Sequence, residues 1–497
     1  MFEGRNYING TYEERDAYFN SYNPSTEEVI GVFPSSNFDD VKRAVQAART
    51  AQVTWRNLSR VKRAEYIDKL CDCLKEKSTI EEFTRIISLE TGKSLNESYA
   101  EVIESLHMIQ YTFGKGREPY GDVVASEIPD KDAYVMRKPK GVVAIIAPWN
   151  FPMAIGGFWC AGPSLLEGNT VVFKPSEDTP MVGQMIANLY HRAGFPPGVF
   201  NLIHGDGGVG SLLVHEDVDH ICFTGSAEVG KLIRIACAES THKTCSCEMG
   251  SKSACIVFDD ADLDLAVSAC FNSAFKLSGQ RCVSSGRILV QESIWQTFKE
   301  RFIAMCEQAT VGDPYSIPAP TFGPLINLKQ KNRVRAFNDL VRNDPDAQVL
   351  VDREFVENLT FGVRPESVGH YLGPFVYSVN WGDKLYLKSE VFGPHVALIP
   401  FSDLEDAIRI YNDTDYGLAL GILTNDFKKA REIRNRCDFG MGYWNGGSIA
   451  AESHLPFGGI KGSGYGWGSA AATFDAVTHK YTWTVNHGGL NFPQGLK

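Results

Sequence analysis

The chain has 497 residues, of which 43% are hydrophobic and 22% charged, and its formal net charge is −11 at pH 7. This length is too great for one compact core, so we expect two or three domains. The composition excludes a disordered or fibrous protein, and the negative charge without a Lys/Arg-rich run argues against nucleic-acid binding. No apolar run reaches the roughly 18 residues of a membrane-spanning helix.

The first residues and the cysteines favour a reducing compartment. Residues 1–16 have no basic region followed by an apolar stretch, so no signal peptide is predicted. The 12 cysteines lack disulfide-scaffold spacing, and we expect buried thiols in a cytoplasmic protein. The C-x-C pairs Cys71/Cys73 and Cys245/Cys247 have no His or Cys cluster nearby, so no metal site is predicted.

Along the chain, the hydrophobic pattern predicts helices first and an α/β arrangement afterwards. Residues 37–115 show apolar side chains at helical spacing, and the stripe from Val182 to Leu189 does the same. Buried strands are predicted at residues 142–147, 171–173, 199–203, 220–223 and 255–258. Such alternation indicates a parallel sheet covered on both faces.

A second α/β unit is predicted after Cys282, with a strand near residues 287–290 and a helix that carries Ile294, Phe298 and Phe302. Near the end of the chain, residues 481–486 alternate like an exposed strand. We expect this strand to pair with another subunit.

Two glycine-containing turns are candidate phosphate sites. Residues 205–210 fit G-x-G-x-x-G after a predicted strand, but no acidic residue follows about 20 positions later, as a dinucleotide fingerprint needs. The alternative interpretation is an ordinary glycine-rich loop. Residues 223–226, with Ser226 as a favoured N-cap, place a helix N-terminus where unpaired N–H groups could meet a phosphate. A simply capped helix fits the same pattern.

Three residues could carry chemistry, each with a structural alternative. Cys282 lies in a polar, glycine-containing junction beside Arg281, which could favour the thiolate; the alternative is a structural thiol. Glu248 stands between a predicted helix and strand, as a general base with a raised pKa or as the partner of Lys252. Asn150 follows a predicted strand, as an oxyanion donor or as a turn residue.

Lys174 and Glu177 also follow a predicted strand, at the edge where open α/β sheets bind ligands. They could hold ribose hydroxyls or form a solvated loop pair.

Taken together, these segments resemble the aldehyde dehydrogenase superfamily over nearly the whole chain. The matching segments, in order, are PWNFP at 148–152, VVFKPSEDTP at 171–180, FTGSAEVGK at 223–231, CEMGSK at 247–252, GQRC at 279–282, EVFGP at 390–394 and LPFGGIKGSGYG at 455–466. Two segments depart from the family pattern. Met249 and Ser251 replace the usual Leu and Gly after the glutamate, and Trp467-Gly468 follows the last motif.

The resemblance implies a role for each matching residue. Cys282 resembles the nucleophile, Asn150 the side-chain half of the oxyanion hole, and Glu248 the base that activates the deacylating water. The implied cofactor contacts are Trp149, Lys174, Glu177, Gly225, Ser226, Glu390 and Phe392. The implied substrate contacts are Phe151, Ile155, Phe158, Trp159 and Phe457, with residues 448–457 at the tunnel mouth.

The resemblance also implies the fold and the partners. We expect an α/β protein in which residues 1–118 and 141–250 bind the cofactor through a Rossmann-like parallel sheet, and residues 251–450 form an α/β catalytic domain. Residues 119–140 and 478–497 would form a small β oligomerisation element, giving a homodimer or homotetramer. NAD is expected because Glu177 would accept bonds from a ribose 2′-hydroxyl and repel a phosphate, with NADP still open.

The substrate implied by the SAFKLSGQRC segment is a semialdehyde bearing a carboxylate; a general aliphatic or aromatic aldehyde is the alternative. Ala450 and Ala451 are small, and His454 either contacts an anionic group or is a solvated loop residue. Two other classes stay open: a CoA-acylating dehydrogenase, against which Glu248 argues, and a non-catalytic structural relative.

Overall fold

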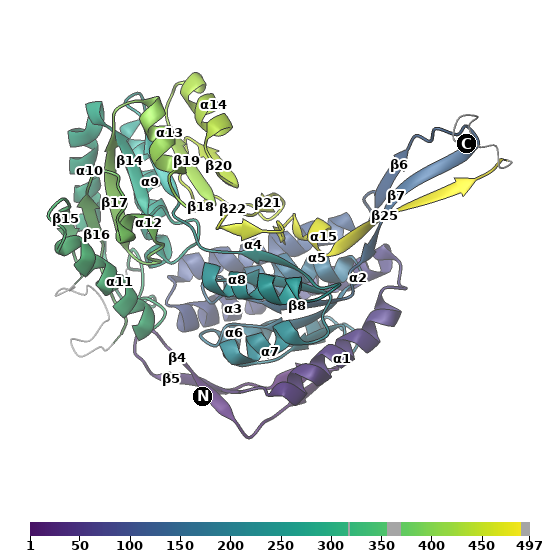
Figure 1. Ribbon diagram of the computed structural model, residues 1–497. Coiled ribbons are helices and arrows are strands. Elements are labelled where there is room, and N and C mark those ends of the chain that lie inside the picture. Colours follow the sequence, from purple (N-terminus) through teal and green to yellow (C-terminus); the bar gives the residue numbers. More distant parts are fainter. Residues whose placement is uncertain (317–318, 355–368, 489–497) are drawn as a thin grey trace.

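The computed structural model describes residues 1–316, 319–354 and 369–488, and it is built around two open α/β sheets and a projecting arm (Figure 1). Four helices precede the first central strand: α1 (Phe38–Trp55), α2 (Arg60–Lys75), α3 (Lys77–Thr91) and α4 (Leu95–Lys115). Asn37, Ser59 and Ser94 cap the first, second and fourth of them through their side-chain oxygens. Helix α3 ends at Gly92, where the positive φ of +73° suits glycine.

The first sheet has the order β23-β12-β11-β8-β9-β10-β2-β3. Its parallel strands are β8 (Val142–Ile146), β9 (Thr170–Lys174), β10 (Phe200–Leu202), β11 (His220–Thr224) and β12 (Thr244–Glu248). The antiparallel edges are β2 (Asn6–Ile8) with β3 (Thr11–Glu13), and β23 (Gly464–Tyr465). Helices α6 (Pro180–Arg192), α7 (Gly207–His215) and α8 (Ala227–Ala238) connect the strands.

One of these strands differs from the prediction. Glu248 is the last residue of β12 and not a residue between helix and strand. The strand has no continuous apolar run, because it carries buried polar residues such as Ser246. The Ser246 hydroxyl has a partner, since its Oγ lies 3.0 Å from His220 Nε2 on the neighbouring strand β11. A strand whose buried polar side chains are hydrogen-bonded is not recognised from its hydrophobicity pattern.

After β8 the chain enters a π-helix, η1 (Pro152–Cys160), which continues as α5 (Ala161–Leu166). Every residue of both helices is buried. π-Helical turns are rare and often occur at functional sites, because the wider turn changes the direction of the side chains. This segment begins two residues after Asn150.

The second sheet has the order β15-β16-β17-β14-β13-β19-β20 and is parallel except at β15. Its strands are β13 (Ala254–Val257), β14 (Arg287–Gln291), β15 (Gln348–Asp352), β16 (Phe375–Ser378), β17 (His395–Phe401), β19 (Ala419–Leu423) and β20 (Met441–Trp444). Its helices are α9 (Leu263–Phe275), α10 (Trp295–Gln308), α11 (Leu328–Arg342), α12 (Leu385–Lys388), α13 (Leu404–Asn412) and α14 (Phe427–Arg436). Short 3₁₀ turns are η2 (Lys276–Gly279) and η3 (Glu292–Ile294).

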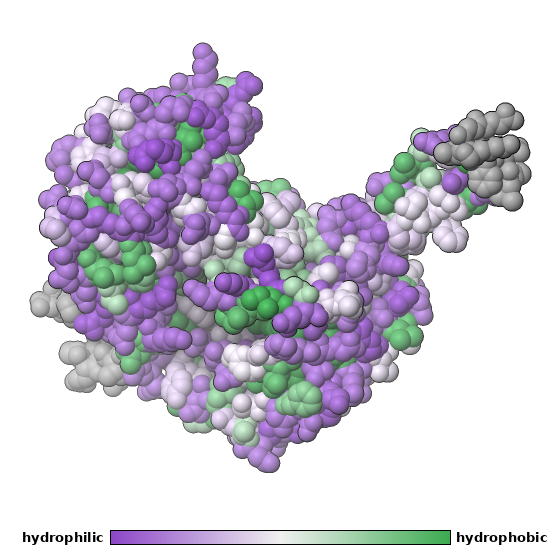
Figure 2. Space-filling model, in the orientation of Figure 1, coloured by the Kyte–Doolittle hydropathy of each residue, from purple (hydrophilic) through white to green (hydrophobic). Residues whose placement is uncertain are grey.

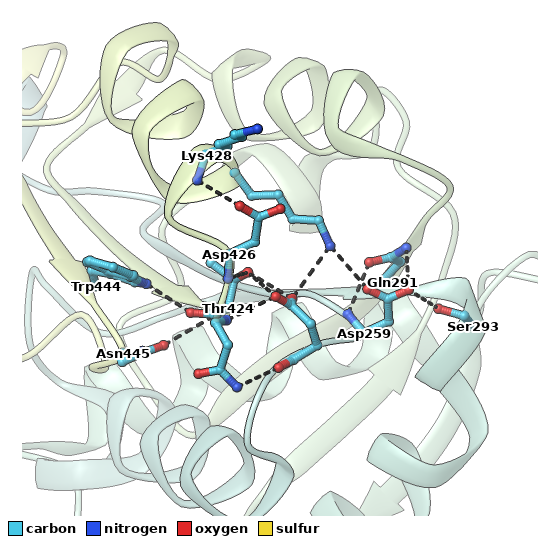
Figure 3. A network of polar contacts seen from close by, with 11 residues as sticks. Asp259, Gln291, Ser293, Thr424, Asp426, Lys428, Trp444 and Asn445 are labelled. Atoms are coloured by element: carbon cyan, nitrogen blue, oxygen red, sulfur yellow. Dashed lines mark hydrogen bonds and ion pairs between the residues drawn. The ribbon is translucent and has the colours of Figure 1, made fainter.

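The carboxyl edge of the second sheet is occupied by its own polar side chains (Figure 3). Asp260 accepts a hydrogen bond of 2.8 Å from Thr424 Oγ1, and Lys429 Nζ lies 3.2 Å from Asp259. Trp444 Nε1 donates to the Thr424 carbonyl at 2.9 Å. These carboxylates therefore already have partners within the second α/β unit.

A three-stranded antiparallel sheet of β6 (Gly121–Val124), β7 (Lys131–Pro139) and β25 (Thr478–Asn486) projects from the body (Figures 1 and 2). Figure 2 shows the surface hollowed between this arm and the second α/β unit. The arm brings together segments 119–140 and 478–488, which were predicted to form one element. The strand predicted at residues 481–486 is confirmed as part of β25. Residues 489–497 of the predicted element lie outside the described residues.

Shorter elements complete the chain. They are β1 (Phe2–Glu3), β4 (Tyr18–Tyr22), β5 (Val29–Pro34), β18 (Tyr416–Gly417), β21 (Pro456–Phe457), β22 (Ile460–Lys461), β24 (Ser469–Ala470) and α15 (Thr473–Ala476). Within the described ranges, no helix has the length and apolar character to cross a membrane.

Candidate active site

The three candidate catalytic residues meet where the two sheets face each other. Asn150 follows β8 and Glu248 ends β12, so both lie at the carboxyl edge of the first sheet. Cys282 lies between η2 and β14, at the amino edge of the second sheet. Carboxyl edges of open parallel sheets are where ligands usually bind.

The loop before Cys282 holds an unusual backbone. Leu277, Ser278 and Gly279 all have positive φ values, of 55°, 55° and 71°. Left-handed non-glycine residues cost about 1–3 kcal/mol each and persist where neighbours fix them. Here the Leu277 N–H donates to Glu97 Oε1 at 2.9 Å, and Ser278 Oγ donates to the Gly323 carbonyl at 2.7 Å. Such strain marks a site whose geometry matters more than local stability.

Cys282 is only partly exposed, and its thiol is held in the protonated form. Burial, followed by the carboxylates Glu390 and Glu248, raises the pKa of Cys282 to about 12. The backbone N–H groups of Val283 and Cys282 hydrogen-bond the sulfur and oppose this shift. The prediction that Arg281 favours the thiolate is therefore wrong in this structure: Arg281 Nη2 bonds Glu97 Oε1 at 3.1 Å. The site needs a base or an added positive charge to release the nucleophile.

Asn150 is buried beside the cysteine loop. Its side-chain Nδ2 donates to the Gln280 carbonyl at 3.0 Å, two residues before Cys282. The Asn150 amide therefore contacts the loop that carries the Cys282 N–H. Two fixed donors near one thiol can stabilise the oxyanion that forms when the thiol adds to a carbonyl.

Replacing Asn150 with alanine is expected to lower kcat for aldehyde oxidation by about 10²–10³-fold, because one oxyanion donor is lost. Stopped-flow measurement of the first turnover checks this. The matched control is Asn188→Ala, on α6, where the side chain accepts from Tyr12 at 2.8 Å near the surface. A first turnover as fast as that of the wild type would contradict the assignment.

Glu248 has the features of a general base. It is 4% exposed, and its Oε1 is buried without a hydrogen-bond partner among the described residues. Burial raises its pKa well above the usual range, while the N–H groups of Gly468 and Gly459 oppose the shift. The alternative of an ion pair with Lys252 is not found, because Lys252 Nζ donates to the carbonyls of Tyr386 and Ser389 at 2.9 and 2.7 Å. A free carboxylate oxygen is thus available to a water molecule.

Helix α4 braces both the Asn150 segment and the cysteine loop. Lys93 and Glu101 form a fully buried ion pair, and Glu101 Oε1 accepts the N–H groups of Met153 and Ala154 at 2.9 and 3.1 Å. The Lys93 ammonium also lies 3.9 Å from the centre of the Phe151 ring. One turn earlier on the helix, Glu97 binds the cysteine loop. The two halves of the candidate oxyanion hole are therefore anchored to one rigid element.

Replacing Lys93 with methionine is expected to lower the free energy of unfolding by about 3–5 kcal/mol, because Glu101 stays buried without its cation. Urea denaturation measures this loss. The control is Lys62→Met, since Lys62 is 62% exposed and pairs with Glu65 on the surface of α2. Equal stabilities of the two variants would show that the buried pair has no special role.

The candidate cofactor residues surround the same edge of the first sheet. Ser226 caps α8 and accepts the Val229 N–H at 3.3 Å. Lys174 is 2% exposed, with Nζ 2.8 Å from the Pro175 carbonyl and 3.7 Å from Glu177, whose side chain is about half exposed. A buried ammonium beside an exposed carboxylate fits a polyhydroxyl ligand such as a ribose.

The glycine-rich segment at 205–210 is a helix start and not a phosphate cradle. Asp206 caps α7, and its carboxylate accepts the N–H groups of Gly208 and Val209 at 2.9 and 3.4 Å. An anion already occupies these donors, so this helix N-terminus is unsuited to a phosphate. The turn at Gly225 and Ser226 remains the candidate for the cofactor pyrophosphate.

The second half of a cofactor site lies nearer the cysteine. Glu390 Oε1 accepts the Ser251 N–H at 2.8 Å, and burial raises the pKa of Glu390 to about 7. The rings of Trp149 and Phe392 meet edge to face with centroids 5.5 Å apart. Phe392 adopts a left-handed φ of +62°, and its carbonyl accepts from Gln330 Nε2 at 2.7 Å. These groups fit a planar ring and an adjoining ribose.

The candidate substrate residues are only partly brought together. Trp159 and Phe457 have ring centroids 5.3 Å apart, and Trp159 Nε1 is buried without a described partner. The Phe158 ring is fully buried and stacks on Tyr190, with centroids 6.3 Å apart, so it packs in the core and does not line a tunnel. The reason is the π-helix, whose wider turn directs Phe158 toward α6.

Four charged residues of this site were not singled out from the sequence: Lys93, Glu97, Glu101 and Glu104. The only signal was the spacing of the carboxylates at i, i+4 and i+7, which places them on one face of a predicted helix. Acidic residues are unusual on a helix face that is otherwise buried. The spacing alone, however, does not identify the groups that these carboxylates contact.

Comparison with known proteins establishes the family. The family model "Aldehyde dehydrogenase family" matches residues 11–483, so the chain belongs to this family. An α-ketoglutaric semialdehyde dehydrogenase of Bacillus subtilis (strain 168) is 33% identical over 463 residues, covering 92% of this chain and 93% of the relative.

The fold is shared with solved members of the family. The betaine aldehyde dehydrogenase of Staphylococcus aureus, solved with NAD+, is 30% identical with a TM-score of 0.91, covering 99% of this chain and 97% of that chain. PnpE, also solved with nicotinamide adenine dinucleotide, is 31% identical with a TM-score of 0.92, covering 99% and 100%. The predicted α/β fold class and the predicted enzyme class, an aldehyde dehydrogenase, are confirmed.

Proposed function

We propose that this protein oxidises an aldehyde to the carboxylic acid with NAD as hydride acceptor, through a thioester on Cys282. The observation that carries the proposal is the meeting of Cys282, Asn150 and Glu248, whose Oε1 has no partner among the described residues, at the junction of two sheets. Because three segments distant in sequence supply one thiol, one amide donor and one buried base, the site contains the parts of acyl-thioester chemistry.

The chain's residues divide the reaction into two halves. The Cys282 thiolate bonds to the carbonyl carbon, and the Asn150 amide with the Cys282 N–H holds the resulting alkoxide. NAD supplies the acceptor for the hydride that leaves this carbon. Glu248 then removes a proton from water, which attacks the thioester and releases the acid and the Cys282 thiolate.

NAD fits the residues assigned to it. The pyrophosphate would meet the start of α8 at Gly225 and Ser226, the adenine ribose Lys174 and Glu177, and the nicotinamide half Trp149, Glu390 and Phe392. We propose NAD over NADP because the Glu177 carboxylate would repel a 2′-phosphate. The solved neighbours that contain NAD support the same choice.

For the substrate we propose a semialdehyde that bears a carboxylate, which the activity named for the Bacillus subtilis relative supports. The alternatives are a general aliphatic or an aromatic aldehyde. His454 lies 3.5 Å from Glu452 and more than half of its side chain is exposed, so it is paired on the surface and contributes little to anion binding.

Initial rates of NADH formation with a panel of aldehydes test the proposal. The panel contains succinic, glutamic and aminoadipic semialdehydes beside acetaldehyde, hexanal and benzaldehyde, each with NAD and with NADP. Turnover that requires NAD and yields the free acid supports the proposal. Turnover only when CoA is added would identify a CoA-acylating dehydrogenase, and NAD binding without any turnover would identify a structural relative.

We also propose that the chain divides into domains at residues 118, 140, 250 and 450.

We further propose a homodimer or homotetramer held by the arm. Exposed apolar side chains on the arm support this assembly, since Val123 is 81% and Trp483 58% exposed. We expect Trp483→Glu to shift the protein to smaller assemblies in sedimentation velocity. Val53→Glu, an equally exposed position on α1, serves as control. An unchanged sedimentation coefficient for Trp483→Glu would oppose assembly through the arm.

A further inference from the structure

The pair Trp467-Gly468 departs from the family pattern, and the proposed reaction gives it no role. Trp467 has a left-handed φ of +39°, which residues other than glycine rarely adopt. Its side chain is exposed to solvent, so packing in a core does not explain this conformation. Such a backbone costs about 1–3 kcal/mol and persists where the surrounding structure fixes it, often at a functional site.

The segment that carries Trp467 folds back on itself beside Glu248. Strands β21 and β24 pair antiparallel and close a hairpin over residues 456–470, which brings residues 458–459 close to residues 467–468. Within the hairpin, β23 pairs antiparallel with β12 and places Gly464 opposite Glu248. The hairpin is therefore attached to the strand that ends in the candidate base.

The indole of Trp467 and the carboxylate of Glu248 meet at Gly458. A Cβ atom at Gly458 would lie 2.9 Å from Trp467 Cε3, 3.1 Å from Trp467 Cδ2 and 3.2 Å from Glu248 Oε1. The fused edge of the indole and the carboxylate oxygen without a partner thus border the same point, where a side chain would displace one of them. Because Glu248 is buried and Trp467 is 39% exposed, the indole lies on the solvent side of the carboxylate.

Gly468 contacts the same carboxylate through its backbone. Its N–H hydrogen-bonds Glu248, as does the N–H of Gly459, whose nitrogen lies 3.3 Å from Oε2. A Cβ atom at Gly468 would collide with Ser246 Oγ, so a side chain at this position would move the N–H away from Glu248. Both residues of the departing pair therefore act on one carboxylate, Trp467 by covering it and Gly468 by donating to it.

No counter-ion balances Glu248 among the described residues, so burial has the largest effect on its protonation. The titratable groups of the elements around it are the thiols of Cys160 and Cys282 and, on the hairpin, Lys461 and Tyr465. Lys461 pairs with Asp438 at 2.8 Å, and the ring of Tyr465 lies 4.4 Å from the Arg234 guanidinium. A change that admits water to Glu248 would therefore lower its pKa.

We propose that Trp467 is a positioning residue for the general base, whose indole keeps bulk water away from the Glu248 carboxylate while the thioester is hydrolysed. The proposal rests on the proposed function, which assigns the base to Glu248. A carboxylate that is shielded from water is a stronger base than an exposed one. The left-handed backbone of Trp467 is the strain that holds the ring in this place.

Infrared titration of the cofactor-free protein tests this role without requiring turnover. The carbonyl band of protonated Glu248 is identified by its absence in Glu248→Gln, and its intensity is followed with pH. We expect Trp467→Gly to lower the midpoint of this titration by about one pH unit or more, because water reaches the carboxylate. Glycine suits the left-handed φ, so the variant removes the ring without adding backbone strain. Trp467→Phe, which keeps a ring, should stay closer to the wild type.

Lys461→Gly is the matched control. Lys461 also has a left-handed φ, of +52°, and its side chain is exposed on the same hairpin. This variant relieves the same kind of backbone strain but keeps the indole, so its midpoint should equal that of the wild type. Circular dichroism confirms that each variant is folded, and a variant that is not folded is replaced by Trp467→Ala or Lys461→Ala.

Rapid mixing with aldehyde and NAD gives a second measurement. In Trp467→Gly the decline of deacylation at low pH should move to lower pH by the same amount as the infrared midpoint. The first turnover should keep the wild-type rate, because thioester formation does not use Glu248. The rate of deacylation at high pH should fall, since a carboxylate of lower pKa is a weaker base.

The outcomes separate this inference from the proposed function. Equal infrared midpoints in the wild type and Trp467→Gly would overturn the role of Trp467. An equal shift in Lys461→Gly would also overturn it, because the effect would then belong to the backbone. A lowered midpoint in Trp467→Gly alone, in a protein that oxidises no aldehyde, would support the shielding of Glu248 and overturn the proposed function instead.

Discussion

Replacing Cys282 with alanine is expected to lower kcat for aldehyde oxidation by about 10⁴-fold or more, because no other group can form the thioester. NAD binding should be retained, since none of the candidate cofactor contacts is removed. NADH formation at saturating aldehyde measures the loss, and fluorescence titration measures NAD binding. The control is Cys437→Ala, a buried thiol next to α14 in the second α/β unit. Substantial residual turnover would mean that the thiol is not the nucleophile.

The same thiol should show a distinct pH dependence in the cofactor-free protein. Because its pKa is raised to about 12, the reactive thiolate is scarce at neutral pH and its fraction grows as pH rises. The rate of Cys282 alkylation by iodoacetamide should increase by about tenfold per pH unit through the neutral range. A rate that levels off near pH 7 would show that burial and the carboxylates of Glu390 and Glu248 do not raise the pKa of the Cys282 thiol.

Replacing Glu248 with glutamine is expected to separate the two halves of the reaction. Thioester formation should continue, while deacylation slows by about 10²–10⁴-fold because water loses its base. Rapid mixing should therefore show a burst of about one NADH per active site, followed by a slow steady rate. Glu239→Gln, at the exposed end of α8, is the control. A variant without a burst would place Glu248 in the first half of the reaction.

The raised pKa of Glu248 also sets the direction of the pH dependence. The base acts only when deprotonated, so in the wild type deacylation should slow as pH falls through the raised pKa. This limb should disappear from the steady-state profile of Glu248→Gln, where hydrolysis no longer depends on that carboxylate. Persistence of the limb would assign it to another group, of which Glu390 is the nearest candidate because its pKa is raised to about 7.

Three acidic groups of the site share one electrostatic condition. Burial raises the pKa values of Cys282, Glu248 and Glu390, and the negative charge of each glutamate raises that of the thiol further. All three groups therefore tend to stay protonated, and an added positive charge would lower all three pKa values. The Cys282 thiol is accordingly expected to react more slowly without such a charge than with it.

Much of the fold follows from short-range patterns. The four N-terminal helices show apolar side chains at a spacing of about 3.6 residues because each buries one face, and the central strands are continuous apolar runs because they are buried on both faces. Strand β12 was not predicted, because it carries buried polar groups that pair with His220 on the neighbouring strand. Which partner satisfies a polar side chain depends on the neighbouring strand, and no local pattern contains that information.

The sequence by itself determined the chemical parts of the candidate site, because motif order and residue type name a thiol, an amide and a carboxylate at fixed positions. Only the tertiary structure decided their states. Arg281 looked like an activator of the adjacent Cys282, but the ion pair with Glu97 on α4 engages it. Likewise, Glu104 is an ordinary helical residue in the sequence and an unpaired buried carboxylate in the fold. Burial and ion pairing depend on contacts between segments that are distant in sequence. They decide whether each group is charged, and hence which chemical role it can have.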